Sequence, residues 1–273
     1  MTNGSALATG DEFAPISAHC DNGTMWWLAH GEHEVPASAD WLSPREQAIL
    51  ATFRYTKRRI EFLARRWTAK RAVAMVLHRD LALAALATVE IRHHGSGAPY
   101  LEVDGRPVAI DVSLSDRAGW AACLVGPPGG SCGPLGIDLE LVEPRSDAFV
   151  GDFFTADESA YVRSLTFGEA RDEAANLIWS AKEAALKVRK VGLRADTREV
   201  AVEIGHARRP DGWTPLSVAG RDGMVFPGWW RRDGVFLLTI TGRQAWPPPE
   251  RLSGGGNLAD AVPVHSWLAQ PLA

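Results

Sequence analysis

The sequence predicts an α/β fold built from two halves of comparable size. Long segments with apolar residues at helical spacing lie on both sides of a short loop rich in glycine and proline, residues 127–131. Shorter segments with the pattern of strands follow each of these helical segments. A chain of 273 residues has the length for one large domain or two of moderate size. We therefore place the boundary between the two halves at this loop.

The composition is that of an ordinary soluble globular protein, with 46% hydrophobic and 23% charged residues. The net charge of -4 argues against a nucleic-acid-binding protein. No run approaches the roughly 18 apolar residues of a membrane span, and the N-terminus has acidic residues without a signal pattern. The three cysteines lack the spacing of a metal site. We therefore expect a cytoplasmic protein with reduced thiols and no membrane or nucleic-acid partner.

Four parts are expected along the chain. They are a flexible N-terminus at residues 1–22, a first α/β half at 23–126 with a basic helix, a second α/β half at 127–243 with the acidic motifs, and a linker and tail at 244–273. The linker is assigned from a run of three prolines and a run of three glycines.

In the first half, residues 24–29 are predicted as a strand, and Ser43 with Glu46 forms a capping box that begins a helix. The next helix runs from residue 57 to about residue 78. One of its faces is basic and is opposed only by Glu61; its members are Arg58, Arg59, Arg65, Arg66 and Lys70. Such a face on an acidic chain favours an anionic ligand. A solvated face balanced by acids elsewhere explains it equally well.

A strand ending near Ile91 leads into a glycine loop at residues 93–100. The adjacent His93 and His94 are a weak metal signal, because neighbours in a turn usually point apart and no third ligand is nearby. The glycines could let the backbone approach a ligand.

Strands are predicted at residues 108–115, 120–125 and 135–142. In the last of them Asp138 and Glu140 are two residues apart, so both project from the same face. Paired carboxylates repel each other unless a cation lies between them, and two hard oxygen ligands suit Mg²⁺. The alternative is an ordinary solvent-facing pair of acids.

Two further helices are predicted in the second half. Thr155 and Glu158 form a capping box, although Glu158 could also complete a metal site as a third carboxylate. The second helix covers residues 170–190 and ends at Gly192. In it Glu183 and Lys187 are one turn apart, as a base and a phosphate clamp would be, or as an exposed ion pair worth a few tenths of a kcal/mol.

The remaining strands are predicted at residues 199–204, 213–218 and 235–241. An aromatic segment at 226–230 precedes the last of them, and we expect it to pack within a sheet rather than to line a pocket.

In order and spacing these motifs resemble the 4'-phosphopantetheinyl transferase superfamily of the Sfp type, and most closely its members that serve siderophore and polyketide synthases. Five segments between about residues 45 and 205 carry the resemblance. They are 57–63, 112–115, 136–140, Phe153-Phe154 followed by Glu158, and 179–187. Jointly, and in this order, they are specific, although each alone is modest.

The resemblance implies two similar α/β halves related by pseudo-two-fold symmetry, with the active site and coenzyme A at their interface. It implies a Mg²⁺-dependent transferase that moves the phosphopantetheine arm of coenzyme A to a serine of an apo acyl or peptidyl carrier protein, releasing adenosine 3',5'-bisphosphate. It fits polyketide or nonribosomal peptide biosynthesis, and we expect a monomer.

The resemblance also assigns roles to residues of this chain. Asp138, Glu140 and Glu158 would hold Mg²⁺, Glu183 would be the general base, and Lys187 would hold the phosphate under attack. The residues expected to contact coenzyme A are Arg58, Arg66, Gly97, Ala98, Pro99, Ser115, Asp116, Asp138, Glu183 and Lys187.

Two positions depart from the family pattern. Asp116 stands where the family usually has a histidine, and Ser96 and Ala98 stand where a lysine is common. An aspartate about 4 Å from a phosphate repels it by ~1 kcal/mol in water-like surroundings and by ~4 kcal/mol at an effective dielectric of 20. The basic helix could hold the nucleotide instead, or Asp116 could point away and pair with Arg117 or Arg58. A weakened relative that binds coenzyme A or a carrier as a regulatory module is the main alternative, and a pyrophosphate hydrolase is a minor one.

Overall fold

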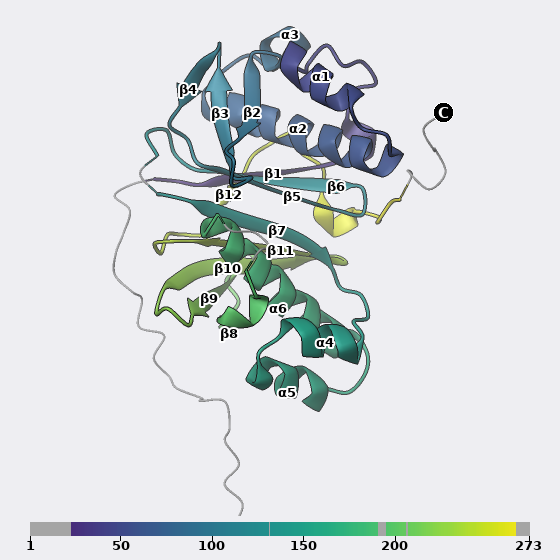
Figure 1. Cartoon of the computed structure of the whole chain (residues 1–273), viewed down its shortest axis with the longest axis vertical. Coiled ribbons are helices and arrows are strands. Elements are labelled where there is room, and N and C mark those ends of the chain that lie inside the picture. The colour runs from purple at the N-terminus through teal and green to yellow at the C-terminus, as the bar shows by residue number, and fades with distance from the viewer. Residues whose placement is uncertain (1–22, 131, 191–194, 206, 266–273) are drawn as a thin grey trace, which may run out of the picture.

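Two largely antiparallel sheets, each covered by one long helix, form the body of the protein (Figure 1). The computed structural model describes residues 23–130, 132–190, 195–205 and 207–265. The predicted flexible N-terminus and the predicted helix end at Gly192 lie outside the described residues. No helix in the described ranges is long and apolar enough to cross a membrane.

The first half carries a four-stranded sheet in the order β12-β1-β6-β5 and a small sheet in the order β2-β3-β4. Its elements are β1 (Trp26–Gly31), α1 (Pro44–Ala51), α2 (Thr56–Val76), α3 (Leu83–Leu86), β2 (Val89–His93), β3 (Pro99–Val103), β4 (Arg106–Val108), β5 (Val112–Arg117) and β6 (Trp120–Val125).

The second half carries a five-stranded sheet in the order β7-β11-β10-β9-β8. Its elements are β7 (Leu135–Leu141), α4 (Asp147–Phe153), α5 (Ala156–Ser164), α6 (Glu169–Val188), the short 3-10 helix η3 (Thr197–Glu199), β8 (Val200–Ile204), β9 (Thr214–Gly220), β10 (Val225–Asp233) and β11 (Phe236–Gly242). The aromatic segment at 226–230 lies within β10, so its predicted place in a sheet is confirmed.

Apolar packing joins helices to sheets and the sheets to one another. Helix α2 packs on the first sheet through a cluster that includes Val73 and Val125, and α6 packs on the second through a cluster that includes Ala181 and Leu237. A third cluster lies between the two sheets and includes Trp27, Trp120, Leu139, Phe236 and Leu238. Burial of these large side chains, at about 25 cal/mol per Å² of apolar area, is the main force that holds the halves together.

Strands β5 and β7 lie side by side where the two sheets meet, as Figure 1 shows. Ser113 on β5 accepts a hydrogen bond from the backbone N–H of Ile137 on β7, at 3.0 Å. The register on the other side of β7 places Asp138 opposite Thr239 of β11. Strand β7 is therefore fixed on both edges, which makes it a rigid support for side chains.

Gly136 explains how closely α6 approaches β7. A Cβ atom at this position would lie 2.0 Å from the backbone oxygen of Ala184, so only glycine fits. Ala181, Ala184 and Ala185 present small side chains along the same helix and are fully buried. The close contact brings the next turns of α6 against the part of β7 that carries Asp138.

The same arrangement of buried charges occurs in both halves, and the first copy involves Lys70 and Glu46. Lys70 on α2 is fully buried, lies 2.5 Å from Glu46, and donates to the backbone oxygens of Trp41 and Leu86 at 3.1 Å. Glu46 closes the capping box of α1 with Ser43, as predicted, and accepts from the backbone N–H of Ile91 on β2.

The second copy lies in the other half. Lys182 on α6 is fully buried, lies 2.7 Å from Glu158, and donates to the backbone oxygens of Thr197 and Val200. Glu158 closes the capping box of α5 and accepts from the backbone N–H of Val202 on β8. The two halves thus share this arrangement, while a two-fold axis between them remains a prediction.

The segment predicted as a linker instead belongs to the first sheet. Strand β12 (Glu250–Arg251) pairs in parallel with β1, with Glu250 opposite Trp26. Trp246 is buried in the cluster between the sheets, and its burial outweighs the extended, linker-like character of the prolines that follow it. The expected tail is therefore packed against the body at least as far as residue 265.

Candidate active site

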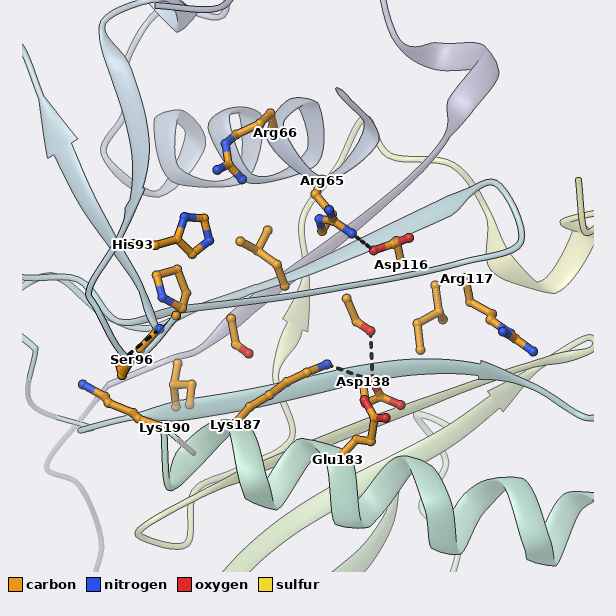
Figure 2. Close-up of a pocket in the computed structure, with 18 of the residues that line it drawn as sticks. Arg65, Arg66, His93, Ser96, Asp116, Arg117, Asp138, Glu183, Lys187 and Lys190 are labelled. Carbon is orange, nitrogen blue, oxygen red and sulfur yellow. Dashed lines mark hydrogen bonds and ion pairs between the residues drawn. The ribbon is translucent and has the colours of Figure 1, made fainter. Parts of the chain in front are cut away.

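A cavity of about 790 Å³ lies between the two halves, and Figure 2 shows the side chains that line it. The first half contributes residues of α2, of β5 and of the glycine loop after β2, while the second half contributes residues of β7 and α6. The charged residues of the lining are Arg65, Arg66, Asp116, Arg117, Asp138, Glu140, Glu183, Lys187 and Lys190. Both signs of charge therefore converge on one space.

Asp138 lies at the centre of the acidic part of this cavity. Its Oδ1 atom accepts hydrogen bonds from the Ser115 hydroxyl at 2.9 Å and from the Lys187 ammonium group at 2.8 Å. Its Oδ2 atom is buried and has no hydrogen-bond partner among the described residues. A buried carboxylate oxygen without a donor is costly, so this atom is suited to a ligand that brings positive charge.

Glu140 projects from the same face of β7 as Asp138, as the sequence predicts. Its Oε2 atom lies 3.1 Å from both Arg117 and Arg145, and its Oε1 atom accepts from the indole N–H of Trp179 at 3.2 Å. Burial, reinforced by Asp138, raises the pKa of Glu140 to about 7 although both guanidinium groups oppose the shift.

Glu183 comes to the same place from α6. Burial raises its pKa to about 8, with Asp138 adding to the shift and Lys187 opposing it. Figure 2 shows Glu183 and Lys187 directed toward Asp138, and both residues are half-buried. The exposed ion pair considered for the sequence 179–187 is therefore excluded, and three carboxylates share one desolvated site.

Trp179 orients the carboxylate group of Glu140. Its ring packs edge-on against Phe149 and Phe153 of α4, with centroids 5.1 and 5.0 Å away. The packing fixes the indole N–H that is donated to Glu140. The segment around Phe153 is one of those that carry the resemblance. It supports Glu140 indirectly, because it packs against Trp179.

Glu158 is not brought together with Asp138 and Glu140, which corrects the expected metal set. Its carboxylate is used by the capping box, by the N–H of Val202 and by the buried ammonium group of Lys182. It is absent from the cavity lining. The capping box visible in the sequence was the better guide to Glu158, because buried donors already satisfy its oxygens.

The basic helix places Arg65 and Arg66 at the cavity, whereas Arg58 is exposed and lies outside the lining. Arg58 and Arg65 are seven residues apart and share a face of α2, so the sequence alone could not choose between them. Asp116 is paired with Arg65, and neither of the partners expected for it, Arg117 or Arg58, is the one observed.

Four other residues expected to contact coenzyme A, Gly97, Ala98, Pro99 and Ser115, line the same cavity. His93, which sequence reasoning treated only as a weak metal ligand, lines it too. Desolvation, followed by the charges of Arg66 and Arg65, lowers the pKa of His93 to about 4. Its position as the last residue of β2, just before a glycine loop, was the available signal.

The 4'-phosphopantetheinyl transferase superfamily is the family whose model matches the chain, over residues 134–213. The predicted resemblance to this superfamily is confirmed for this part of the protein, and the Sfp type stays a prediction. The matched part spans β7 and α6, and so includes Asp138, Glu140, Glu183 and Lys187.

No curated protein matches the sequence. Among solved structures, one described as "Chronobacterium ammoniagenes ACPS-CoA complex" matches with 22% identity and a TM-score of 0.32, over 39% of this chain and 96% of that one. A TM-score this low carries no argument about the fold or the function of this chain.

Among the described residues, no group of three or more His, Cys, Asp and Glu side chains is placed so that it could hold a metal ion by itself. The carboxylate oxygens of Asp138 and Glu140 nevertheless suit Mg²⁺. This ion is usually held by one or two carboxylates, and substrate phosphates and water complete its coordination. The unpartnered Oδ2 atom of Asp138 and the raised pKa of Glu140 are what such a cation would relieve.

Proposed function

We propose that this protein transfers the 4'-phosphopantetheine arm of coenzyme A to a serine hydroxyl of an apo carrier protein and releases adenosine 3',5'-bisphosphate. One observation carries the proposal most directly. Glu183 and Lys187, one helical turn apart in the family-matched segment, both converge on Asp138 in a cavity lined by basic side chains.

The proposed reaction exchanges one P–O bond for another. The serine oxygen attacks the pyrophosphate phosphorus that bears the pantetheine arm, and the bond from this phosphorus to the bridging oxygen breaks. The hydroxyl proton passes to Glu183, and the bridging oxygen leaves with adenosine 3',5'-bisphosphate. Such a transfer depends on positioning and on neutralising charge rather than on protein covalent chemistry.

Glu183 suits the role of the base. Its pKa of about 8 lies near neutral pH, where proton acceptance by a positioned carboxylate gives about 10²–10⁴-fold in rate. Lys187 suits the role of the phosphate clamp, because its ammonium group is held at the cavity by Asp138 and by the backbone oxygen of Ile137. When the ammonium group of Lys187 moves from these oxygens to a phosphate of the ligand, it exchanges one oxygen partner for another.

Asp138 and Glu140 would hold Mg²⁺, with Glu183 beside them and Glu158 taking no part. When bound, the cation would neutralise the charge of the pyrophosphate. Arg117 and Arg145 already neutralise the negative charge of Glu140, so the unpartnered carboxylate oxygen of Asp138 is the better metal ligand.

The test is the mass of a purified apo carrier protein after incubation with coenzyme A and Mg²⁺. A gain equal to the phosphopantetheine arm is expected, with strong loss in Glu183→Gln and none in Arg58→Ala, a change outside the cavity. An unmodified carrier that still binds the protein would favour the regulatory module that Asp116 motivates. Release of adenosine bisphosphate without any carrier would favour the hydrolase. Acyl and peptidyl carriers should be compared side by side.

A further inference from the structure

Asn176 lies on α6 one turn before Trp179 and is fully buried, yet it does not line the cavity. Its Nδ2 atom donates to the backbone oxygens of Glu143 and Asp172, at 2.6 and 2.7 Å. Its Oδ1 atom accepts from the Nε atom of Arg145 at 2.6 Å. Both polar atoms of this buried amide are therefore engaged, and one of its bonds leads to a charged side chain.

Arg145 links Asn176 to the acidic part of the site. It lies in the segment between β7 and α4, and its Nη2 atom donates to Oε2 of Glu140 at 3.1 Å. Its guanidinium group lies 4.7 Å from the centre of the Phe149 ring, and its backbone oxygen accepts from Arg171 at 3.4 Å. The side chain of Arg145 is only 16% exposed and is absent from the cavity lining. It therefore acts on Glu140 and not on a ligand.

The packing of a helix on its sheet does not by itself require a buried amide at this position. Lys70 and Lys182 hold equivalent places in the two halves, and Asn176 lies six residues before Lys182. The residue six before Lys70 is Ala64, which is buried and has no polar side chain. Burying an amide costs free energy unless its hydrogen bonds are made. The contacts with the segment 143–145, and not helix packing, therefore explain Asn176.

We propose that Asn176 is a positioning residue that acts through Arg145 and orients the carboxylate of Glu140. This role rests on the proposed function, in which Asp138 and Glu140 hold Mg²⁺. A carboxylate binds a metal well when partners outside the coordination shell have already oriented it. Trp179 bonds to Oε1 of Glu140 and Arg145 bonds to Oε2, so the plane of the carboxylate is defined by the protein itself.

Calorimetric titration of Mg²⁺ into the protein, with and without coenzyme A and without any carrier, tests this role apart from transfer. The dissociation constant for Mg²⁺ describes the folded protein, so a modest loss of stability does not mimic the effect. Asn176→Leu should raise this constant by about 10-fold, the lower end of the range for such partners. Asn176→Asp should keep it within about 3-fold, because a carboxyl oxygen can still accept from the Nε atom of Arg145.

Arg145→Lys provides a second variant, and it decides together with Asn176→Asp if Asn176→Leu does not fold. It should also raise the constant about 10-fold, because lysine keeps the charge but cannot bond to Asn176 and Glu140 in a fixed geometry. Adding Asn176→Leu to it should change the constant by less than about 2-fold, since the two residues act through one contact. Leu177→Ala, in the apolar cluster between α6 and its sheet, is the matched control. It should lower the melting temperature and leave the constant unchanged.

The outcomes separate the positioning role from the proposed function. An unchanged constant in Asn176→Leu, equal weakening by Asn176→Leu and Asn176→Asp, or full additivity with Arg145→Lys would overturn the positioning role. Carrier modification by the native protein alongside any of these results leaves the transferase standing. The expected Mg²⁺ constants without carrier modification support the positioning role and overturn the transferase. No Mg²⁺ binding by the native protein, with or without coenzyme A, overturns the positioning role.

Discussion

The ammonium nitrogen of Lys187 lies 2.8 Å from Oδ1 of Asp138 and 2.7 Å from the backbone oxygen of Ile137. This contact ties the last turns of α6 to the centre of β7. It is possible because Gly136 lets the helix approach the strand so closely. Two sequence motifs that are far apart along the chain thus act as one charged unit.

Lys187→Met should lower the rate of carrier modification by about 10²–10³-fold, the usual cost of removing a group that stabilises developing charge. Lys187→Arg should retain part of the rate, because it keeps the charge but not the geometry. The rates are measured by mass spectrometry at saturating coenzyme A. Equal rates for the native protein and Lys187→Met would remove the lysine from the mechanism.

Glu183→Gln should stabilise the metal-free protein at pH 8 and have little effect at pH 5. The folded-state pKa of Glu183, about 8, is above the unfolded value of 4.5, so its favourable contribution is present below the unfolded value and is lost as the pH rises to 8. Replacing the carboxyl by a neutral amide avoids this loss. The melting temperature in a metal chelator, at both pH values, measures the effect.

Adding Mg²⁺ in place of the chelator provides the control. The cation should raise the melting temperature of the native protein at pH 8, and by less for Asp138→Asn, because it binds only the folded state. A lower melting temperature for Glu183→Gln at pH 8 without metal would contradict the crowding of carboxylates around Asp138.

Glu158→Gln should unfold more easily by ~3–5 kcal/mol, the range found when one partner of a buried ion pair is removed. The reason is that Lys182, fully buried, would lose its countercharge. Urea titration measures the free energy, and Glu46→Gln is the matched variant in the other half. If Glu158→Gln instead keeps its stability and weakens Mg²⁺ binding, Glu158 is a metal ligand after all.

Asp116→Asn should lower the KM for coenzyme A by roughly 5-fold, since removing a like charge near a polyanion gains on the order of 1 kcal/mol. It would also release Arg65 from its ion pair and make a guanidinium group available to the ligand. The gain should shrink in high salt. A higher KM in Asp116→Asn would show that Asp116 positions Arg65 for the ligand rather than competing with it.

The sequence was sufficient for the elements that obey local rules. The capping boxes at Ser43 and Thr155 begin α1 and α5 as predicted. Helix α2 and helix α6 end within two residues of their predicted limits, because apolar spacing determines them. The pairing of Asp138 with Glu140 on one face also follows from the period of a strand.

The rest depended on contacts between distant segments. Nothing local distinguishes Arg58 from Arg65, or shows that Lys182 occupies the carboxylate of Glu158. One signal was available and was missed: Trp67-Thr68-Ala69-Lys70 is repeated as Trp179-Ser180-Ala181-Lys182. This repeat marks the two buried lysines, and with Glu46 it indicates that Glu158 is a structural partner.

The most direct test of the central claim is the intact mass of an apo carrier protein incubated with coenzyme A, Mg²⁺ and this protein. We predict a mass increase equal to one phosphopantetheine arm on the carrier serine, abolished by Glu183→Gln and retained by Arg58→Ala. An unchanged mass across a panel of acyl and peptidyl carriers, with the protein folded and coenzyme A bound, would contradict the account.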